Sequence, residues 1–124
     1  PQGTDFDIAA LLYVQGESDS DSESKASGER LRLLAENLRH DLPHAGSMYV
    51  LVGGIAAAGR NCDVVREQQS RLPATDPTFR YVDTLDLRSQ LYDRLHFSKS
   101  AKLELGMRLA DAWLATRDLS SKRR

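Results

Sequence analysis

An aspartate and a histidine stand three residues apart in the segment Asp93-Arg94-Leu95-His96. A carboxylate and an imidazole at this spacing can form the base half of a hydrolytic triad, in which the histidine takes a proton from a nucleophile. The spacing by itself is common by chance, and a surface histidine with a polar partner is then the more frequent interpretation. A second polar segment is needed before chemistry can be inferred.

That second segment is Gln15-Gly16-Glu17-Ser18-Asp19, which directly follows the apolar run at residues 8–14. A continuous apolar run of this length is typical of a strand that is covered on both faces within a parallel sheet. Polar side chains at the carboxyl end of such a strand are a common place for an active site. The two segments together predict a site at one edge of a sheet.

The rest of the chain supplies the elements that must position these segments. Two further strands are predicted, at residues 48–52 and 79–82, and three helices, at residues 26–42, 61–72 and 98–116, the last with Ser98 as its N-cap. Between the first strand and the first helix, residues 18–24 alternate serine with acid and are predicted to form a solvated loop. This order predicts an α/β fold with a parallel sheet between helices.

Composition limits the class of protein. With 17 basic and 18 acidic residues among 124, the net charge of −1 predicts no nucleic-acid or membrane partner. Cys62 is the single cysteine, so it can form neither an internal disulfide nor a zinc site by itself, and it is interpreted as a small buried or half-buried apolar residue. Because the chain starts at Pro1 and enters a strand almost at once, we expect residues upstream, and hence the carboxyl-terminal half of a soluble domain.

Residues 11–19, 65–69 and 93–113 contain, in this order, the patterns Y-x-Q-G-E-x-D, V-R-E-x-Q and D-x-x-H…L-G-x-R-x-A-x-A. With these blocks the chain resembles the sialate O-acetylesterase-like branch of the SGNH hydrolases, in particular the plant-type carbohydrate esterases. The resemblance implies a three-layer α/β/α sandwich that is incomplete at its amino terminus, with the domain at residues 1–118 and a charged tail at residues 119–124. It also implies an esterase that removes acetyl groups from carbohydrates through an acyl-serine, without a metal or other cofactor.

The resemblance assigns roles to the catalytic pair. His96 would be the general base, and Asp93 the carboxylate that orients the imidazole and stabilises its protonated form. The serine nucleophile and the family's second block match no segment of this sequence, and they are expected upstream of Pro1. The substrate would be an acetylated carbohydrate or a small acetyl ester.

The resemblance also assigns roles to the segment after the first strand. Gln15 and Gly16 would belong to the oxyanion hole, with the Gln15 side-chain amide as a hydrogen-bond donor to the developing oxyanion. Gly16 would let the backbone pass close to the substrate. Glu17 and Asp19 would be carboxylates that support the loop by hydrogen bonds.

Other residues that could do chemistry have plainer interpretations. Ser18 and Ser98 do not lie in a strand-to-helix elbow that would expose a nucleophile, so solvation or helix capping is favoured for both. His40 and His44 flank a predicted helix end and are interpreted as helix-end or solvent-facing residues rather than a metal pair. Gly53-Gly54 forms no phosphate-binding motif and is predicted to be a turn in a flexible crossover.

Two alternatives to an active esterase stay open at this point. The chain could be a noncatalytic carbohydrate-binding or interaction module that keeps the esterase fold, or an incomplete gene product that does not function alone. Because its nucleophile is expected elsewhere, we predict that the isolated chain has no acetylesterase activity. The sequence indicates neither the compartment nor the oligomeric state.

Overall fold

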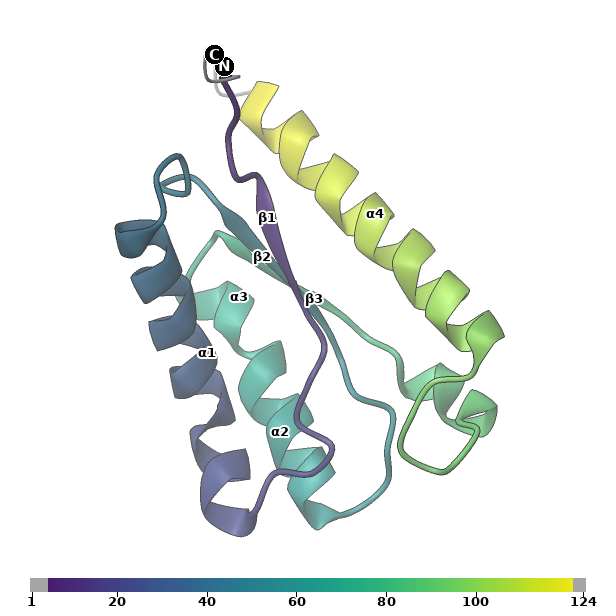
Figure 1. Cartoon of the computed structure of the whole chain (residues 1–124). Helices are drawn as coiled ribbons and strands as arrows, with labels where there is room; N and C mark the ends of the chain where they lie inside the picture. Colours follow the sequence, from purple (N-terminus) through teal and green to yellow (C-terminus); the bar gives the residue numbers. More distant parts are fainter. Residues whose placement is uncertain (1–4, 122–124) are drawn as a thin grey trace.

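A parallel sheet of three strands forms the centre of the molecule (Figure 1). The structure is a computed structural model that describes residues 5–121, so the expectations for Pro1 and for residues 122–124 of the tail lie outside it. The strands are hydrogen-bonded in the order β1 (Ala10–Tyr13), β2 (Tyr49–Gly53) and β3 (Phe79–Val82). Because both pairings are parallel, the carboxyl ends of all three strands meet at one edge of the sheet.

Helices cover the two faces of this sheet. One face carries α1 (Asp21–Asp41), α2 (Arg60–Ser70) and α3 (Leu72–Thr75), and the other carries α4 (Lys99–Ser121), as Figure 1 shows. A 3₁₀ helix, η1 (Leu85–Gln90), follows β3. This arrangement confirms the predicted α/β/α architecture with a parallel sheet. Among the helices described, none combines the length and apolar character needed to cross a bilayer.

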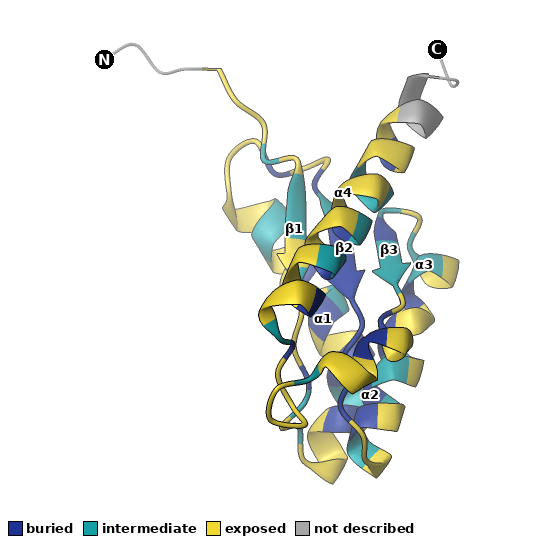
Figure 2. Ribbon diagram, turned by 90° about the vertical axis from the view of Figure 1, so that its right-hand side faces the viewer, coloured by how far each residue is buried: buried dark blue, intermediate teal, exposed yellow. Residues whose placement is uncertain are grey.

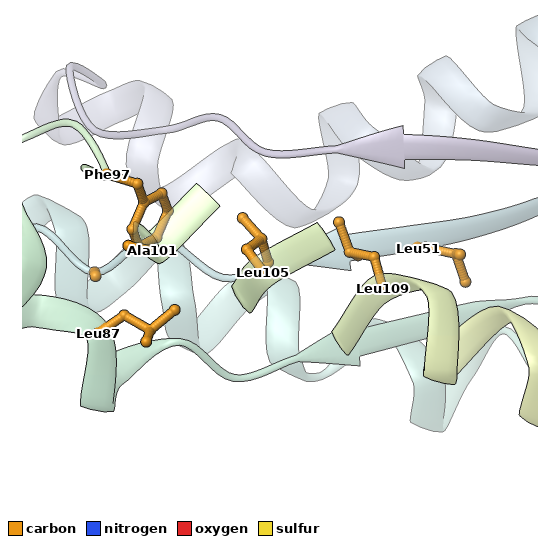
Figure 3. Packing of buried hydrophobic residues seen from close by; sticks show 7 residues of the cluster. Leu51, Leu87, Phe97, Ala101, Leu105 and Leu109 are labelled. Carbon is orange, nitrogen blue, oxygen red and sulfur yellow. The ribbon is translucent and has the colours of Figure 1, made fainter. Parts of the chain in front are cut away.

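The central strand β2 supplies both halves of the core. Val50 and Val52 are fully buried in one cluster with Leu31 of α1. Leu51, between them in sequence, is buried in a second cluster with Leu105 of α4 (Figure 3). Successive side chains of a strand point to opposite faces, so a strand with helices on both sides must be apolar throughout. The predicted buried strand at residues 48–52 is thus confirmed.

The first strand, in contrast, is only partly covered. Within the described chain, β1 pairs with β2 alone and forms an edge of the sheet. Leu12 is 61% exposed and Val14 is 38% exposed. The prediction that residues 8–14 are covered on both faces is wrong here, because α4 packs mainly on β2 and β3 and leaves Leu12 of β1 largely uncovered. Figure 2 shows the contrast, with β1 largely in the intermediate colour and β2 in the buried colour.

The predicted loop at residues 18–24 is wrong over its second half, because α1 begins at Asp21. Ser20 is the N-cap: its hydroxyl accepts from Glu23 N at 3.4 Å, and its own N–H donates to the Glu23 carboxylate at 2.9 Å. This reciprocal pair is a capping box, and carboxylates in the first turn also favour the positive end of the helix dipole. The alternation of serine with acid marks a helix start.

Two other helix boundaries differ from the prediction. The helix predicted at residues 61–72 is divided, since α2 ends at Ser70 and Pro73 lies in the first turn of α3. Proline suits a first turn because its missing N–H has no helical acceptor there. The last helix continues to Ser121. At its start the Ser98 hydroxyl accepts from Ala101 N at 3.3 Å, which confirms Ser98 as its cap.

Candidate active site

The Asp93–His96 pair lies in a short loop between η1 and α4. The loop is closed at its base by an antiparallel bridge between Leu91 and Phe97. Inside this bridge, Tyr92 N donates a hydrogen bond of 3.0 Å to the carbonyl of His96. The chain therefore returns on itself within a few residues, and the aspartate and histidine are held at the tip.

The two carboxylate oxygens of Asp93 make different contacts in this loop. Oδ1 accepts hydrogen bonds from the backbone N–H groups of His96 at 2.7 Å and Leu95 at 3.0 Å, which fixes the turn. Oδ2 lies 2.6 Å from Nδ1 of the His96 ring. The hydrogen bond from the imidazole, with those from the backbone, holds the pKa of the Asp93 carboxyl well below its ordinary value. The carboxylate is therefore ionised at neutral pH, and it can only accept, so Nδ1 carries the proton.

The other ring nitrogen of His96 is left for chemistry. Neutral imidazole carries one proton, and with that proton on Nδ1 the Nε2 atom is an acceptor. The imidazole stacks on the Tyr92 ring, with centroids 5.9 Å apart, and its side chain is 60% exposed. An acceptor on an oriented and accessible ring is what a general base requires.

The polar segment after β1 contains a buried glycine with an unusual conformation. Gly16 has a φ of 132°, a region that side chains disfavour. A Cβ atom at this position would lie 2.6 Å from Cγ1 of Val65 in α2. The close approach that requires glycine in this structure is therefore to helix α2, and the approach of Gly16 to substrate stays a prediction.

Helix α2 holds the same segment through three hydrogen bonds to its backbone. Gln69 Nε2 donates to the carbonyl of Gln15 at 3.1 Å, and Asn61 Nδ2 donates to the carbonyl of Asp19 at 3.1 Å. The Cys62 thiol points to the carbonyl of Glu17 at 3.7 Å. Sequence reasoning missed these donors, because nothing in the pattern shows which helix packs under the loop.

Glu17 and Asp19 were predicted to support the loop by hydrogen bonds from their carboxylates, and the structure of the described residues does not show these contacts. Within the described part of the chain, the carboxylates of Glu17 and Asp19 make no hydrogen bond, and the support comes from α2 instead. Burial and the neighbouring Glu23 raise the pKa of the Asp19 carboxyl. Glu17 lines a hollow together with residues of the histidine loop, and Asp19 is not among the residues that line it.

That hollow, of about 350 Å³, brings the two polar segments together. It is lined by side chains from the end of β1, from the histidine loop and from α4: Val14, Glu17, Tyr92, His96, Phe97, Lys102 and Leu105. Gln15 is not among the lining residues, but it stands in sequence between two that are. Both segments follow carboxyl ends of parallel strands, which explains why they meet at one edge of the sheet (Figure 1).

Comparison with known proteins identifies the family. Residues 2–115 match the family described as carbohydrate esterase, sialic acid-specific acetylesterase. The chain belongs to this family. The match confirms the resemblance that the three sequence blocks indicated.

The chain covers less than half of each protein in the two matches that follow. A protein of Arabidopsis thaliana named as a probable carbohydrate esterase is 35% identical over 111 residues, which cover 88% of this chain and 41% of the relative. An X-ray structure of an Arabidopsis thaliana protein is similar with a TM-score of 0.74 and 34% identity, covering 88% of this chain and 45% of that one. The chain thus spans less than half the length of these relatives.

Ser98, Ser18 and Cys62 are side chains of this member of the carbohydrate esterase family that could be considered as nucleophiles. Ser98 caps α4, as described above, and Ser18 is exposed on the loop after β1. Cys62 is 5% exposed, which agrees with its interpretation as a buried apolar residue. Burial raises the pKa of its thiol, so at neutral pH the sulfur stays protonated and weakly nucleophilic.

The two histidines near the end of α1 have separate neighbours. His40 Nδ1 lies 2.7 Å from the carboxylate of Asp41, and the His44 ring contacts Phe6 with centroids 5.2 Å apart. Over residues 5–121, no three His, Cys, Asp or Glu side chains are placed to hold a metal ion.

Gly53 and Gly54, at the end of β2, do not form the flexible turn that was predicted. Gly53 belongs to the strand, and a Cβ on Gly54 would lie 2.4 Å from the Tyr81 hydroxyl. Residues 54–57 are buried, and their carbonyls accept from two guanidinium groups: Arg66 donates to Ala57 at 2.7 Å, and Arg88 donates to Ala56 at 2.8 Å. These glycines are needed for close packing, and the segment is held by long-range hydrogen bonds.

Proposed function

We propose that the chain is the carboxyl-terminal part of a serine-type carbohydrate acetylesterase. In this proposal His96 is the general base, Asp93 is its orienting carboxylate and Gln15 is an oxyanion-hole donor. The observation that carries it is the 2.6 Å contact between Asp93 Oδ2 and His96 Nδ1, beside a hollow that Glu17 also lines. Membership of the carbohydrate esterase family supports the reaction class.

The reaction would proceed through an acetyl-serine. A serine hydroxyl, supplied by polypeptide outside this chain, loses its proton to Nε2 of His96 while its oxygen attacks the acetyl carbonyl carbon. The imidazolium then gives this proton to the leaving sugar oxygen as the ester bond breaks. Water repeats the sequence on the acetyl-serine and releases acetate.

The side chains of this chain would lower the barrier in two ways. The ionised Asp93 carboxylate would stabilise the imidazolium, and in the neutral ring it would select the tautomer with the proton on Nδ1, which leaves Nε2 as the acceptor. The Gln15 amide would donate an N–H to the carbonyl oxygen as it gains negative charge. An uncharged donor suits this task, since it needs no reorganisation when the charge appears.

The decisive experiment is His96→Ala in the natural polypeptide that contains this sequence, assayed on p-nitrophenyl acetate and on an acetylated sugar. We expect kcat/KM to fall by at least about 10³-fold, because the general base is lost. His40→Ala is a matched control. His40 also pairs with an aspartate, but it lies at the carboxyl end of α1, whereas the segment Gln15–Asp19 precedes the amino end of that helix. Turnover that survives in His96→Ala, or is lost equally in His40→Ala, would rule out this mechanism.

A further inference from the structure

Three residues of α2, spaced four apart, contact the segment that follows β1. Asn61 and Gln69 donate to the carbonyls of Asp19 and Gln15, and Val65 packs against Gly16. Residues four apart lie on the same side of a helix. The segment therefore runs along one stripe of α2, from Gln69 at its start to Asn61 at its end.

Gln69 is the buried member of this stripe that carries an amide. It is 1% exposed, and its Nε2 makes the 3.1 Å hydrogen bond to the Gln15 carbonyl. A carbonyl oxygen only accepts, so this contact fixes the orientation of the amide, with nitrogen toward Gln15 and oxygen away from it. Over the described chain, Gln69 Oε1 is the buried side-chain atom without a hydrogen-bond partner.

An amide in this place is costly if its only role is to fill space. Buried polar atoms are nearly always paired, and an unpaired oxygen opposes folding, whereas a methionine of similar length would pack without that penalty. The amide is explained by its other end, which reaches the backbone of the residue assigned to the oxyanion hole. Val65 closes the space beside Gly16, so the segment has little freedom to shift toward the helix.

We propose that the α2 stripe, and Gln69 above all, is a positioning device for the oxyanion-hole donor Gln15. By holding the Gln15 carbonyl, Gln69 sets the direction in which the chain leaves β1 and hence where the Gln15 side chain is presented. Gln69 does not touch the substrate in this scheme. The inference rests on the proposed function, because it concerns the placement of a catalytic donor.

The test compares Gln69→Met and Gln69→Glu with wild type in the natural polypeptide. For Gln69→Met we expect kcat to fall about 10- to 100-fold with KM within about twofold, since a small misplacement of a catalytic group acts on the transition state. Gln68→Met is the matched control: it removes an amide from the next position of α2, outside the stripe, and should leave kcat unchanged.

Gln69→Glu adds a readout that a packing role would not move. An ionised glutamate would set oxygen against the Gln15 carbonyl, whereas a protonated one can donate to it, and burial raises the pKa of such a carboxyl. We therefore expect the ratio of variant to wild-type kcat to rise as pH falls. A ratio that is independent of pH, or a folded Gln69→Met enzyme with wild-type kcat, would overturn the proposal.

Two further comparisons, with variants at Asn61 and at His96, separate the possible outcomes. If both substitutions at Gln69 prevent folding, the test moves to the half-buried Asn61. Asn61→Leu should lower kcat by less than the change expected for Gln69→Met and should leave KM unchanged. An unchanged kcat in Asn61→Leu would overturn the positioning role of the stripe. Activity that persists in His96→Ala would instead refute the proposed function. Loss in His96→Ala with no effect at Gln69 or Asn61 would refute this inference alone.

Discussion

The two polar segments that meet at the sheet edge are held in opposite ways. The histidine loop is fixed by contacts between near neighbours in sequence, such as Asp93 with Leu95 and His96. The segment from Gln15 to Asp19 is fixed by side chains more than forty residues away, on α2. The first is local and exposed, and the second is long-range and packed against a buried stripe.

The two segments also differ in how the proposed catalytic roles and the structural roles are distributed among their residues. In the histidine loop one carboxylate both shapes the turn and contacts the imidazole, so in the proposed mechanism a single residue would carry the structural and the catalytic role. After β1 the roles would be divided in the proposed mechanism: Gln15 is exposed and would offer the donor, while Gly16 is buried and connects the segment to the core. Substitutions at these two neighbours should therefore have separable effects.

The largest separable effect is expected for Gln15→Ala. Loss of one oxyanion-hole donor typically lowers turnover by about 10²- to 10³-fold, and we expect that loss in kcat. The thermal midpoint should change little, because the side chain is exposed and its backbone carbonyl still accepts from Gln69. Kinetics on an acetyl ester and a thermal scan of the same preparation measure both. A normal kcat would remove Gln15 from the mechanism.

The complementary prediction concerns Gly16→Ala. An alanine would adopt a disfavoured φ and meet Val65, so we expect a loss of about 3 kcal/mol in the free energy of unfolding, measured by urea titration. Gly46→Ala is the control, since nothing lies within 4 Å of a Cβ there, and it should change stability by less than about 0.5 kcal/mol. Equal stabilities for the two variants would contradict the packing of this segment on α2.

The same contrast explains which parts of the molecule could be predicted. The strand at Phe79–Val82, the Ser98 cap and the Asp93–His96 pair depend on residues close together in sequence, and all three are present in the structure. The capping box at Ser20 was equally local, in the pattern S-x-x-E, but the polar composition of the segment suggested a loop.

Other features depend on residues that are distant in sequence, and their patterns could not predict them. The exposure of Leu12 follows from the position of β1 in the sheet, not from its apolar run. The conformation of Gly16 depends on Val65, and the role of Gln69 on which loop packs over α2. The glutamine of the V-R-E-x-Q block, Gln69, was the available signal for its contact with Gln15, but the motif alone does not indicate which residue the glutamine contacts.

The smallest effect is expected in the pH dependence of stability at Asp93. Its pKa is lower in the folded chain than in the unfolded one, so the ionised carboxylate stabilises the fold above its ordinary pKa of about 4, and this contribution is lost as pH falls below that value. Asp93→Asn removes the titrating group. We therefore expect the difference in thermal midpoint between wild type and Asp93→Asn to be modest at pH 7 and to shrink toward pH 3.

Both oxygens of Asp93 make their contacts within the histidine loop. This measurement therefore also tests whether that loop is held only by residues close together in sequence. Asp76 is a useful comparison: burial acts against its ionisation, but hydrogen bonds from Thr78 and the charge of Arg39 on α1 lower its pKa overall. Asp76→Asn should show the same sign of pH dependence and a larger loss of stability at neutral pH, since it also disturbs a contact between elements. If Asp93→Asn destabilises the protein more than Asp76→Asn at neutral pH, the histidine loop contributes to the core and the contrast between the two segments fails.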